Sequence, residues 1–174
     1  MTKLTCIALL LLCPSIAAAQ KRQQPPPPSS TITLSIPGLN CTTAAGGSTF
    51  NVLAWAWGAS NSGTLVGALA GAGKTTLQDL NVTKSFDGCS AAVLSAITTG
   101  AVLKGATLTQ VGADVSRTTT VELEGVLLTS WSVGSTTTQE APSENLTLNF
   151  IKICMRDTAS GTSACYDAST ATQP

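Results

Sequence analysis

The chain has 174 residues, enough for one domain with a hydrophobic core, and its nine basic side chains balance nine acidic ones. This balance argues against a nucleic-acid partner, which needs clustered lysine and arginine, and the absence of histidine excludes Ser-His-Asp and Cys-His catalysis and the HExxH zinc motif. Charged residues make up only 10% of the chain, so little charge repulsion opposes self-association and the surface is a candidate for assembly; a neutral Ser/Thr coat on a secreted protein is the alternative.

Residues 1–19 have the pattern of a secretory signal peptide. Lys3 gives a weakly positive start, Ile7–Leu12 form an apolar core too short to span a bilayer, and Ala17–Ala19 offer an A-x-A cleavage site. We therefore expect cleavage between Ala19 and Gln20, and export of the mature chain to the periplasm or to the outside of the cell.

Residues 20–30, QKRQQPPPPSS, are expected to form a proline-rich linker, because proline neither donates to a strand ladder nor continues a helix. One domain is expected over residues 31–168, followed by a frayed tail at 169–174. No apolar run after the signal peptide is long enough to cross a bilayer, so no membrane span is expected in the mature chain.

Alternation of apolar and polar residues predicts two strands early in this domain. The segment 31–36, TITLSI, alternates cleanly before a Pro-Gly turn, and 50–58, FNVLAWAWG, is the most aromatic stretch. The apolar phase changes within the second segment, which predicts a bulge near Leu53. Trp55 and Trp57 share one strand face, as either a sugar-stacking platform or part of the core.

A glycine-rich connection follows, and within it Ala68–Thr75, ALAGAGKT, matches the loose form of a phosphate-binding loop. The stricter motif has glycine where Ala68 stands, and the loop should join a strand to a helix. Here it leads into another strand at Leu77, so we reject a nucleotide site.

The segment 77–110 reads as strand, helix, strand. Ser90 is the expected N-cap of a short helix, about Ser90–Thr99, which should end at Gly100 in a left-handed conformation. The strands before and after it carry alternating apolar residues, Leu80 with Val82 and Ala106 with Leu108. The buried helix face is expected to carry Val93, Leu94 and Ile97.

Two further strands are predicted, a long bent one at 118–134 and another at 144–153. Glu122 and Glu124 share one face of the first, and we interpret them as solvent-exposed rather than as an acid–base pair. Five aromatic side chains are expected in the core: Trp55, Trp57, Phe86, Trp131 and Phe150.

The signal peptide removes two cysteines and leaves Cys41, Cys89, Cys154 and Cys165. No CxxC pair is present, which argues against zinc or thiol exchange, and an even number of cysteines in an exported protein predicts two disulfides. Cys154 and Cys165 lie symmetrically about a Ser-Gly turn, which favours their pairing across a hairpin. Cys41 with Cys89 follows by elimination, with free buried thiols as the alternative.

Four blocks in order resemble the haemolysin-coregulated protein (Hcp) family, the tube proteins of type VI secretion: FNVLAWAWGAS, LQDLNVTKSFDGCSAAVLSAITTGAVLKGATLT, VELEGVLLTSWSVGS and ENLTLNFIKI. The resemblance implies a mainly β fold, a small two-sheet antiparallel β-barrel with one short helix. It also implies hexameric rings that stack into a hollow tube carrying secreted effector proteins, with no catalytic residues and no cofactor.

This sequence departs from the family pattern in its signal peptide, its paired cysteines and its proline linker, because family members are typically cytoplasmic before secretion. An exported ring-forming protein is the function we expect, and a monomeric secreted module that binds a glycan or a protein is the alternative. An enzyme would need a carboxylate cleft among Asp79, Asp87, Glu122 and Glu124, and their scattered spacing argues against one.

Overall fold

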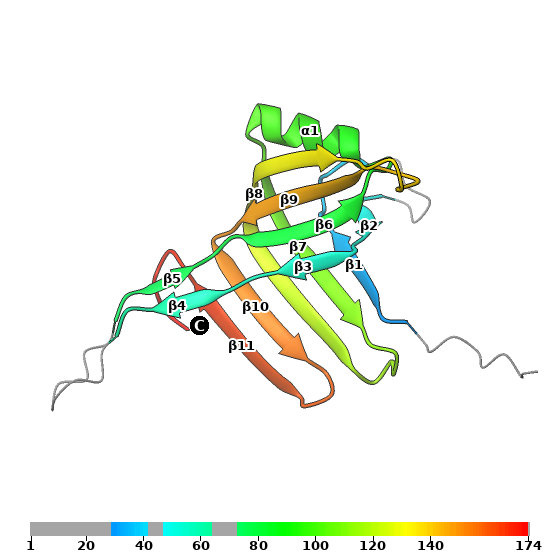
Figure 1. The fold of residues 1–174 in the computed structure, drawn as a ribbon. Helices are drawn as coiled ribbons and strands as arrows, with labels where there is room; N and C mark the ends of the chain where they lie inside the picture. Colours follow the sequence, from blue (N-terminus) through cyan, green and yellow to red (C-terminus); the bar gives the residue numbers. More distant parts are fainter. Residues whose placement is uncertain (1–28, 42–46, 64–72, 174) are drawn as a thin grey trace, which may run out of the picture.

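A computed structural model describes residues 29–41, 47–63 and 73–173, and Figure 1 shows the fold. The expected signal peptide, its cleavage site, most of the linker and most of the rejected phosphate-loop motif lie outside these residues. The described residues form one helix and eleven strands. The elements are β1 (Thr31–Ser35), β2 (Thr49–Asn51), β3 (Ala54–Ala56), β4 (Ala59–Asn61), β5 (Thr75–Leu77), β6 (Leu80–Ser85), α1 (Ser90–Thr99), β7 (Val102–Val111), β8 (Thr118–Gly134), β9 (Ser143–Asn149), β10 (Lys152–Asp157) and β11 (Thr162–Asp167).

Nine of these strands form one antiparallel sheet, in the order β2-β1-β7-β8-β9-β6-β3, with β10 and β11 branching from β8. The 17 residues of β8 serve both halves of the sheet, since its first part pairs with β10 and its last part with β9. The sheet therefore bends around β8 into two layers that enclose the core (Figure 1). This confirms the mainly β, two-layer antiparallel fold with one short helix.

The bend in β8 lies at Gly125, whose φ of 63° is in the left-handed region that favours glycine. The alternation of inward-facing and outward-facing side chains shifts by one residue there, because Leu123 and Val126 are both buried although they are three residues apart. A Cβ atom at this position would lie 2.6 Å from the Ile151 side chain, so a larger residue would be excluded by space as well as by φ.

The two end strands of the sheet, β2 and β3, are joined only by Val52 and Leu53. Val52 donates its N–H to β1, and Leu53 donates to β6, so this short link connects the edges of the two layers. The expected interruption near Leu53 is present. Leu53 itself is 61% exposed, however, and Val52 points inward.

The helix α1 packs against β8 and lies at one end of the molecule (Figure 1). Gly100 ends it with a φ of 62°, as predicted. The predicted N-cap was wrong by one residue, because Cys89 occupies that position and the Ser90 hydroxyl instead accepts from the Asp87 N–H. Leu94 is 45% exposed because Ser90, Val93 and Ala96 form the buried face, which corrects the predicted face.

The expected core aromatics divide into three groups. Phe150 is 7% exposed, and Trp55, Trp57 and Trp131 are half-buried against the core. Phe86 was wrongly placed, because it is 48% exposed. The chain leaves β6 at Ser85 and turns toward α1, so strand alternation no longer directs the next side chain inward.

The strand predicted at 144–153 is two strands, β9 and β10, separated by Phe150 and Ile151. The separation allows β9 to pair with β6 and β8, whereas β10 pairs with β8 and β11. The described part of the expected frayed tail is also ordered, because Asp167 and Thr172 exchange backbone hydrogen bonds around a turn.

Candidate assembly surface

The outer side of β3, β6, β9 and the last part of β8 is an uncharged polar surface, here called the neutral face. Opposed residues in a ladder point to the same side of a sheet, so register and exposure together define its members. They are Ala54, Ala56, Asn81, Thr83, Ser85, Ser130, Ser132, Ser143, Asn145, Thr147 and Asn149. The Asp79 carboxylate lies at one end of this surface, where it accepts a hydrogen bond from Asn149. Removing the rest of the surface from water carries no charge-desolvation cost, which suits contact between subunits.

Hydrogen bonds between neighbouring strands order the neutral face. The Thr83 hydroxyl donates to Asn145 Oδ1 at 2.8 Å, and the Thr147 hydroxyl donates to Asn81 Oδ1 at 3.0 Å. These cross-strand bonds hold the side chains in fixed orientations, so little side-chain entropy remains to be lost when a partner covers them.

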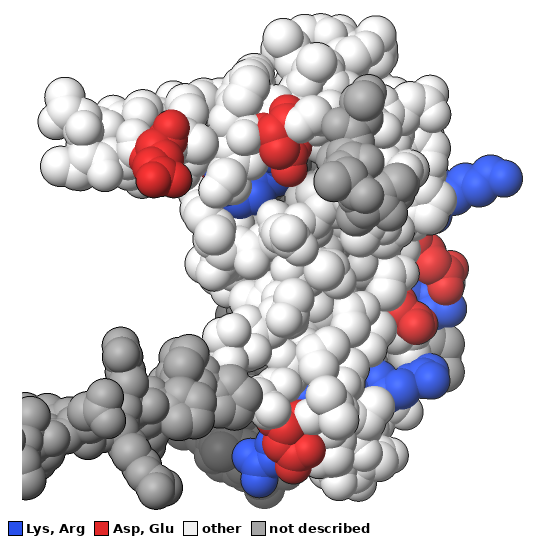
Figure 2. All heavy atoms as spheres, turned by 90° about the vertical axis from the view of Figure 1, so that its right-hand side faces the viewer, with Lys and Arg blue, Asp and Glu red and all other residues white. Residues whose placement is uncertain are grey.

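Charged side chains are sparse elsewhere too, as Figure 2 shows for one side of the molecule, where red and blue atoms form isolated clusters on a white surface. Lys152 Nζ lies 2.9 Å from Glu124 Oε1, so one exposed pair neutralises itself between β10 and β8. The low charge of the sequence is therefore also a property of the folded surface.

A buried ionic network lies behind the neutral face. Lys84 on β6 and Glu144 on β9 are both 0% exposed and face each other in the ladder, and Lys84 Nζ lies 2.8 Å from Glu144 Oε2. The same ammonium lies 2.8 Å from Asp87 Oδ1 and donates to the Ser85 carbonyl, also at 2.8 Å. Among the described residues, Glu144 Oε1 has no hydrogen-bond partner.

The network fixes the loop between β6 and α1, since Asp87 also accepts the Cys89 N–H at 2.8 Å. Sequence reasoning missed it, although a signal existed. Strand alternation puts Lys84 on the same side as Leu80 and Val82, and Glu144 on the same side as Leu146, so both charges should point inward.

The structure joins the cysteines in the two pairs that the sequence suggested. Cys41 bonds to Cys89 with their Cα atoms 4.4 Å apart, which ties the segment after β1 to the start of α1. Cys154 and Cys165 are opposed residues of β10 and β11, with Cα atoms 4.0 Å apart.

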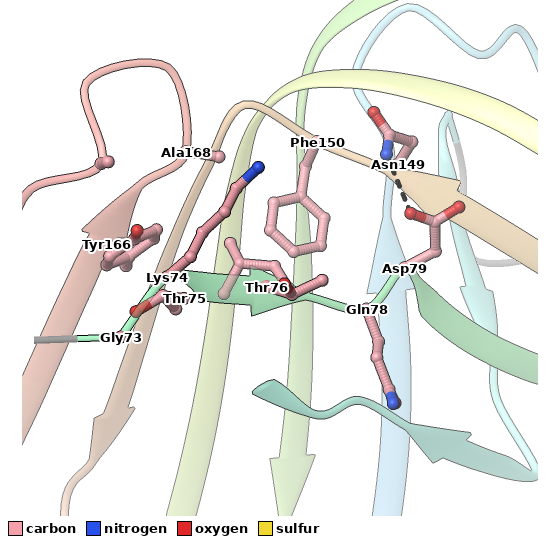
Figure 3. Close-up of a pocket in the computed structure, with 12 residues that line it drawn as sticks. Gly73, Lys74, Thr75, Thr76, Gln78, Asp79, Asn149, Phe150, Tyr166 and Ala168 are labelled. Carbon is pink, nitrogen blue, oxygen red and sulfur yellow. Dashed lines mark hydrogen bonds between the residues drawn. The ribbon is translucent and has the colours of Figure 1, made fainter. Parts of the chain in front are cut away.

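Among the described residues, five strands have only one hydrogen-bonded neighbour and so one unpaired edge: β2, β3, β4, β5 and β11. β11 pairs only with β10, and β5 pairs only with β4. Such edges expose N–H and C=O groups that other chains can pair with. Between β5 and β11 lies a pocket of about 430 Å³, lined by residues 73–79 on one side and by Phe150, Tyr166 and Ala168 on the other (Figure 3).

Three aspartates at the surface, Asp114, Asp157 and Asp167, have lowered pKa values because they accept local hydrogen bonds. The Ser160 hydroxyl chiefly lowers the pKa of Asp157, and the Ser169 hydroxyl that of Asp167. The Ser116 backbone N–H chiefly lowers the pKa of Asp114. Each carboxylate closes a turn, which assigns it a structural role.

The acidic residues considered for catalysis are used separately. Asp79 accepts from Asn149 Nδ2 at 2.8 Å and from the Thr129 hydroxyl at 3.1 Å, whereas Asp87 belongs to the Lys84 network. In the part of the chain that the structure describes, no three histidine, cysteine or acidic side chains are grouped as metal ligands require. Over the same residues, no helix has the length and hydropathy needed to cross a membrane.

A family model described as "Type VI secretion system effector, Hcp" matches residues 30–156. The chain belongs to the Hcp family. This places it among the type VI secretion tube and effector proteins, a family of structural secretion proteins.

Solved Hcp structures share this fold. One, described as a type six secretion system protein, superposes with a TM-score of 0.71 and 18% identity over 84% of this chain and 100% of its own. Hcp1 from Salmonella typhimurium gives a TM-score of 0.70, with 18% identity over 84% and 99%. A type VI secretion system effector from Yersinia pestis gives 0.64, with 21% identity over 78% and 98%. A comparison with curated proteins finds no match.

Proposed function

We propose that this Hcp-family chain is an exported subunit that assembles into closed hexameric rings, which stack into a tube and carry effector proteins. The observation that carries the proposal is the family match over residues 30–156, together with a fold that superposes on complete Hcp chains. Ring assembly is the property that the sequence resemblance implies for such a fold.

The surface supports assembly. A closed ring needs two complementary surfaces on each subunit, and the unpaired strand edges of β2 and β3, at the two ends of the main sheet, offer backbone groups for that purpose. The neutral face adds contact area with no buried charge. A tube built from such subunits would present hydroxyl and amide groups rather than fixed charges to its neighbours or to a passenger protein.

Export distinguishes this subunit from a cytoplasmic tube protein. The segment 1–19 reads as a signal peptide, and two disulfides suit the oxidising periplasm or the cell exterior. We expect the mature chain to start at Gln20. Intact mass of the secreted protein tests this, and Ala19→Leu should block cleavage, whereas Ala18→Leu should leave it unchanged because that position of A-x-A is free.

The deciding experiment measures the mass of the mature protein without reductant, by light scattering on a sizing column, with negative-stain images of the same peak. Closed rings of about six subunits would support the proposal. A monomer across a wide concentration range would refute it. The function would then be that of a secreted binding module.

The tryptophan pair offers little to that alternative. Trp55 and Trp57 are half-buried against the core, and Trp55 Nε1 donates to Gln110 Oε1 at 2.9 Å. A sugar-stacking platform requires an exposed ring face, which these two residues do not provide as a pair.

A further inference from the structure

The strand β5 has one edge used by β4 and one edge free. The Ser62 N–H donates to the Lys74 carbonyl at 3.2 Å, and the Gln78 N–H donates to the Gly58 carbonyl at 2.9 Å. In an antiparallel ladder the N–H and C=O of one residue point to the same side, and the side alternates along the strand. Thr75 and Leu77 therefore direct their backbone groups away from β4, and no other strand among the described residues pairs with them.

The free edge borders the pocket of about 430 Å³ described above, where β5 forms one wall. Phe150 and Tyr166 contribute aromatic surface and Ala168 lies near them (Figure 3), and Ala171 also lines the pocket. A chain lying along β5 would gain backbone hydrogen bonds on one side and apolar contact beneath alternate side chains. These are the two components of strand addition.

The two ends of the pocket differ in charge. Lys74 is exposed, its side chain points into the pocket, and no described carboxylate pairs with its ammonium (Figure 3). Asp79 at the other end already accepts hydrogen bonds from Asn149 and Thr129. The unpaired positive charge favours an acidic group on the bound chain.

We propose that this pocket binds an extended segment of another polypeptide as an added strand on β5. Its apolar side chain lies against Phe150 and Tyr166, and its acidic residue lies beside Lys74. The three residues of β5 span roughly 10 Å, so the site accommodates only a short segment of the bound chain. The site lies within a single subunit, because β5, Phe150, β11 and the turn that follows β11 all belong to one chain.

The test uses the mature protein and a fluorescein-labelled peptide, Asp-Val-Thr-Val-Thr, with Lys-Val-Thr-Val-Thr as the charge-reversed control. Fluorescence anisotropy measures binding, and hydrogen exchange measures protection of the Thr75 and Leu77 amides. The variant Thr75→Pro removes a donor only from the free edge, where strands tolerate proline. Ala59→Pro is the matched control, since it removes a donor from the far edge of β4 in the same hairpin.

Binding of the acidic peptide, with protection of both amides, would support the proposal. Thr75→Pro should then weaken binding about tenfold, the effect of one lost hydrogen bond, and Ala59→Pro should leave it unchanged. Lys74→Met should remove the preference for the acidic peptide over the charge-reversed one. If Thr75→Pro does not fold, this variant still tests the proposal.

Equal binding by wild type and Thr75→Pro, or no binding of either peptide, would overturn the proposal. The proposal would also be overturned if wild type formed rings without peptide and Thr75→Pro separated them into subunits. Another copy of the chain would then occupy the free edge of β5 in the ring. Light scattering on the same samples separates this from a failure of ring assembly, since a monomer that binds the peptide refutes only the ring.

Discussion

Replacing Lys84 with methionine should destabilise the protein strongly, because it leaves the Glu144 carboxylate buried without its counter-charge. The two groups are 0% exposed and 2.8 Å apart, so the carboxylate is not at the solvent-accessible surface. Removing one partner of a buried ion pair typically costs about 3–5 kcal/mol. Asp87 also loses its contact with the ammonium, but its side chain is 33% exposed and water can replace that contact.

Thermal and urea unfolding of the disulfide-bonded mature protein at neutral pH would measure the effect. For a domain of this size the unfolding midpoint should fall by roughly 10 °C. The double variant Lys84→Met with Glu144→Leu removes both charges from opposed positions of β6 and β9, and should regain most of the loss.

Lys152→Met is the matched control. Its partner Glu124 is 65% exposed, so the change should alter the free energy of unfolding by less than about 1 kcal/mol. The reasoning would be refuted if Lys84→Met were as mild as this control, or if the double variant were no more stable than the single one.

The two disulfides should contribute unequally, because their loops differ in length. In the chain-entropy model, removing Cys154–Cys165, with a separation of 11 residues, should cost about 3 kcal/mol of stability, and removing Cys41–Cys89, with a separation of 48, should cost about 4 kcal/mol. Urea unfolding of variants with both cysteines of a pair replaced by serine should show that order. The reverse order would contradict the model. Acid should also destabilise the protein. The Asp157 carboxylate has a lowered pKa in the folded state, so its contribution is present above the unfolded value near 4 and is lost as the pH falls through the folded value. The melting temperature should drop between about pH 5 and pH 2, and Asp157→Asn should reduce that drop; an unchanged pH profile would count against the assignment.

Sequence reasoning succeeded where local patterns decide structure. Gly100 ends the helix because glycine adopts the left-handed conformation without strain, and the bounds of β8 follow from its long run of strand-forming residues. The cysteine pairs followed from a turn between Cys154 and Cys165. Each of these features depends on residues close to one another in the chain, except the Cys41–Cys89 pair, which is separated by 48 residues and followed by elimination.

Errors arose where a neighbouring element redirected the chain. Phe86 continues the alternation of β6 in sequence, but the turn toward α1 begins before it. The apolar stretch around Phe150 and Ile151 reads as one strand, yet its two halves pair with different partners. Leu94 satisfies a helical spacing, but β8 covers the face of α1 that carries Val93.

The sequence by itself determined the class of fold, the family and the neutral character of the surface, because apolar spacing, ordered blocks and composition are properties of the linear chain. The tertiary structure alone decided which charges meet in the core and which strand edges remain open. Lys84 and Glu144 are 60 residues apart in sequence and become partners only when β6 pairs with β9. The free edge of β5 is likewise visible only in the fold, because β4 pairs with one edge of β5 and no other described strand pairs with the second. Strand pairing of this kind depends on the positions of all the strands in the folded chain.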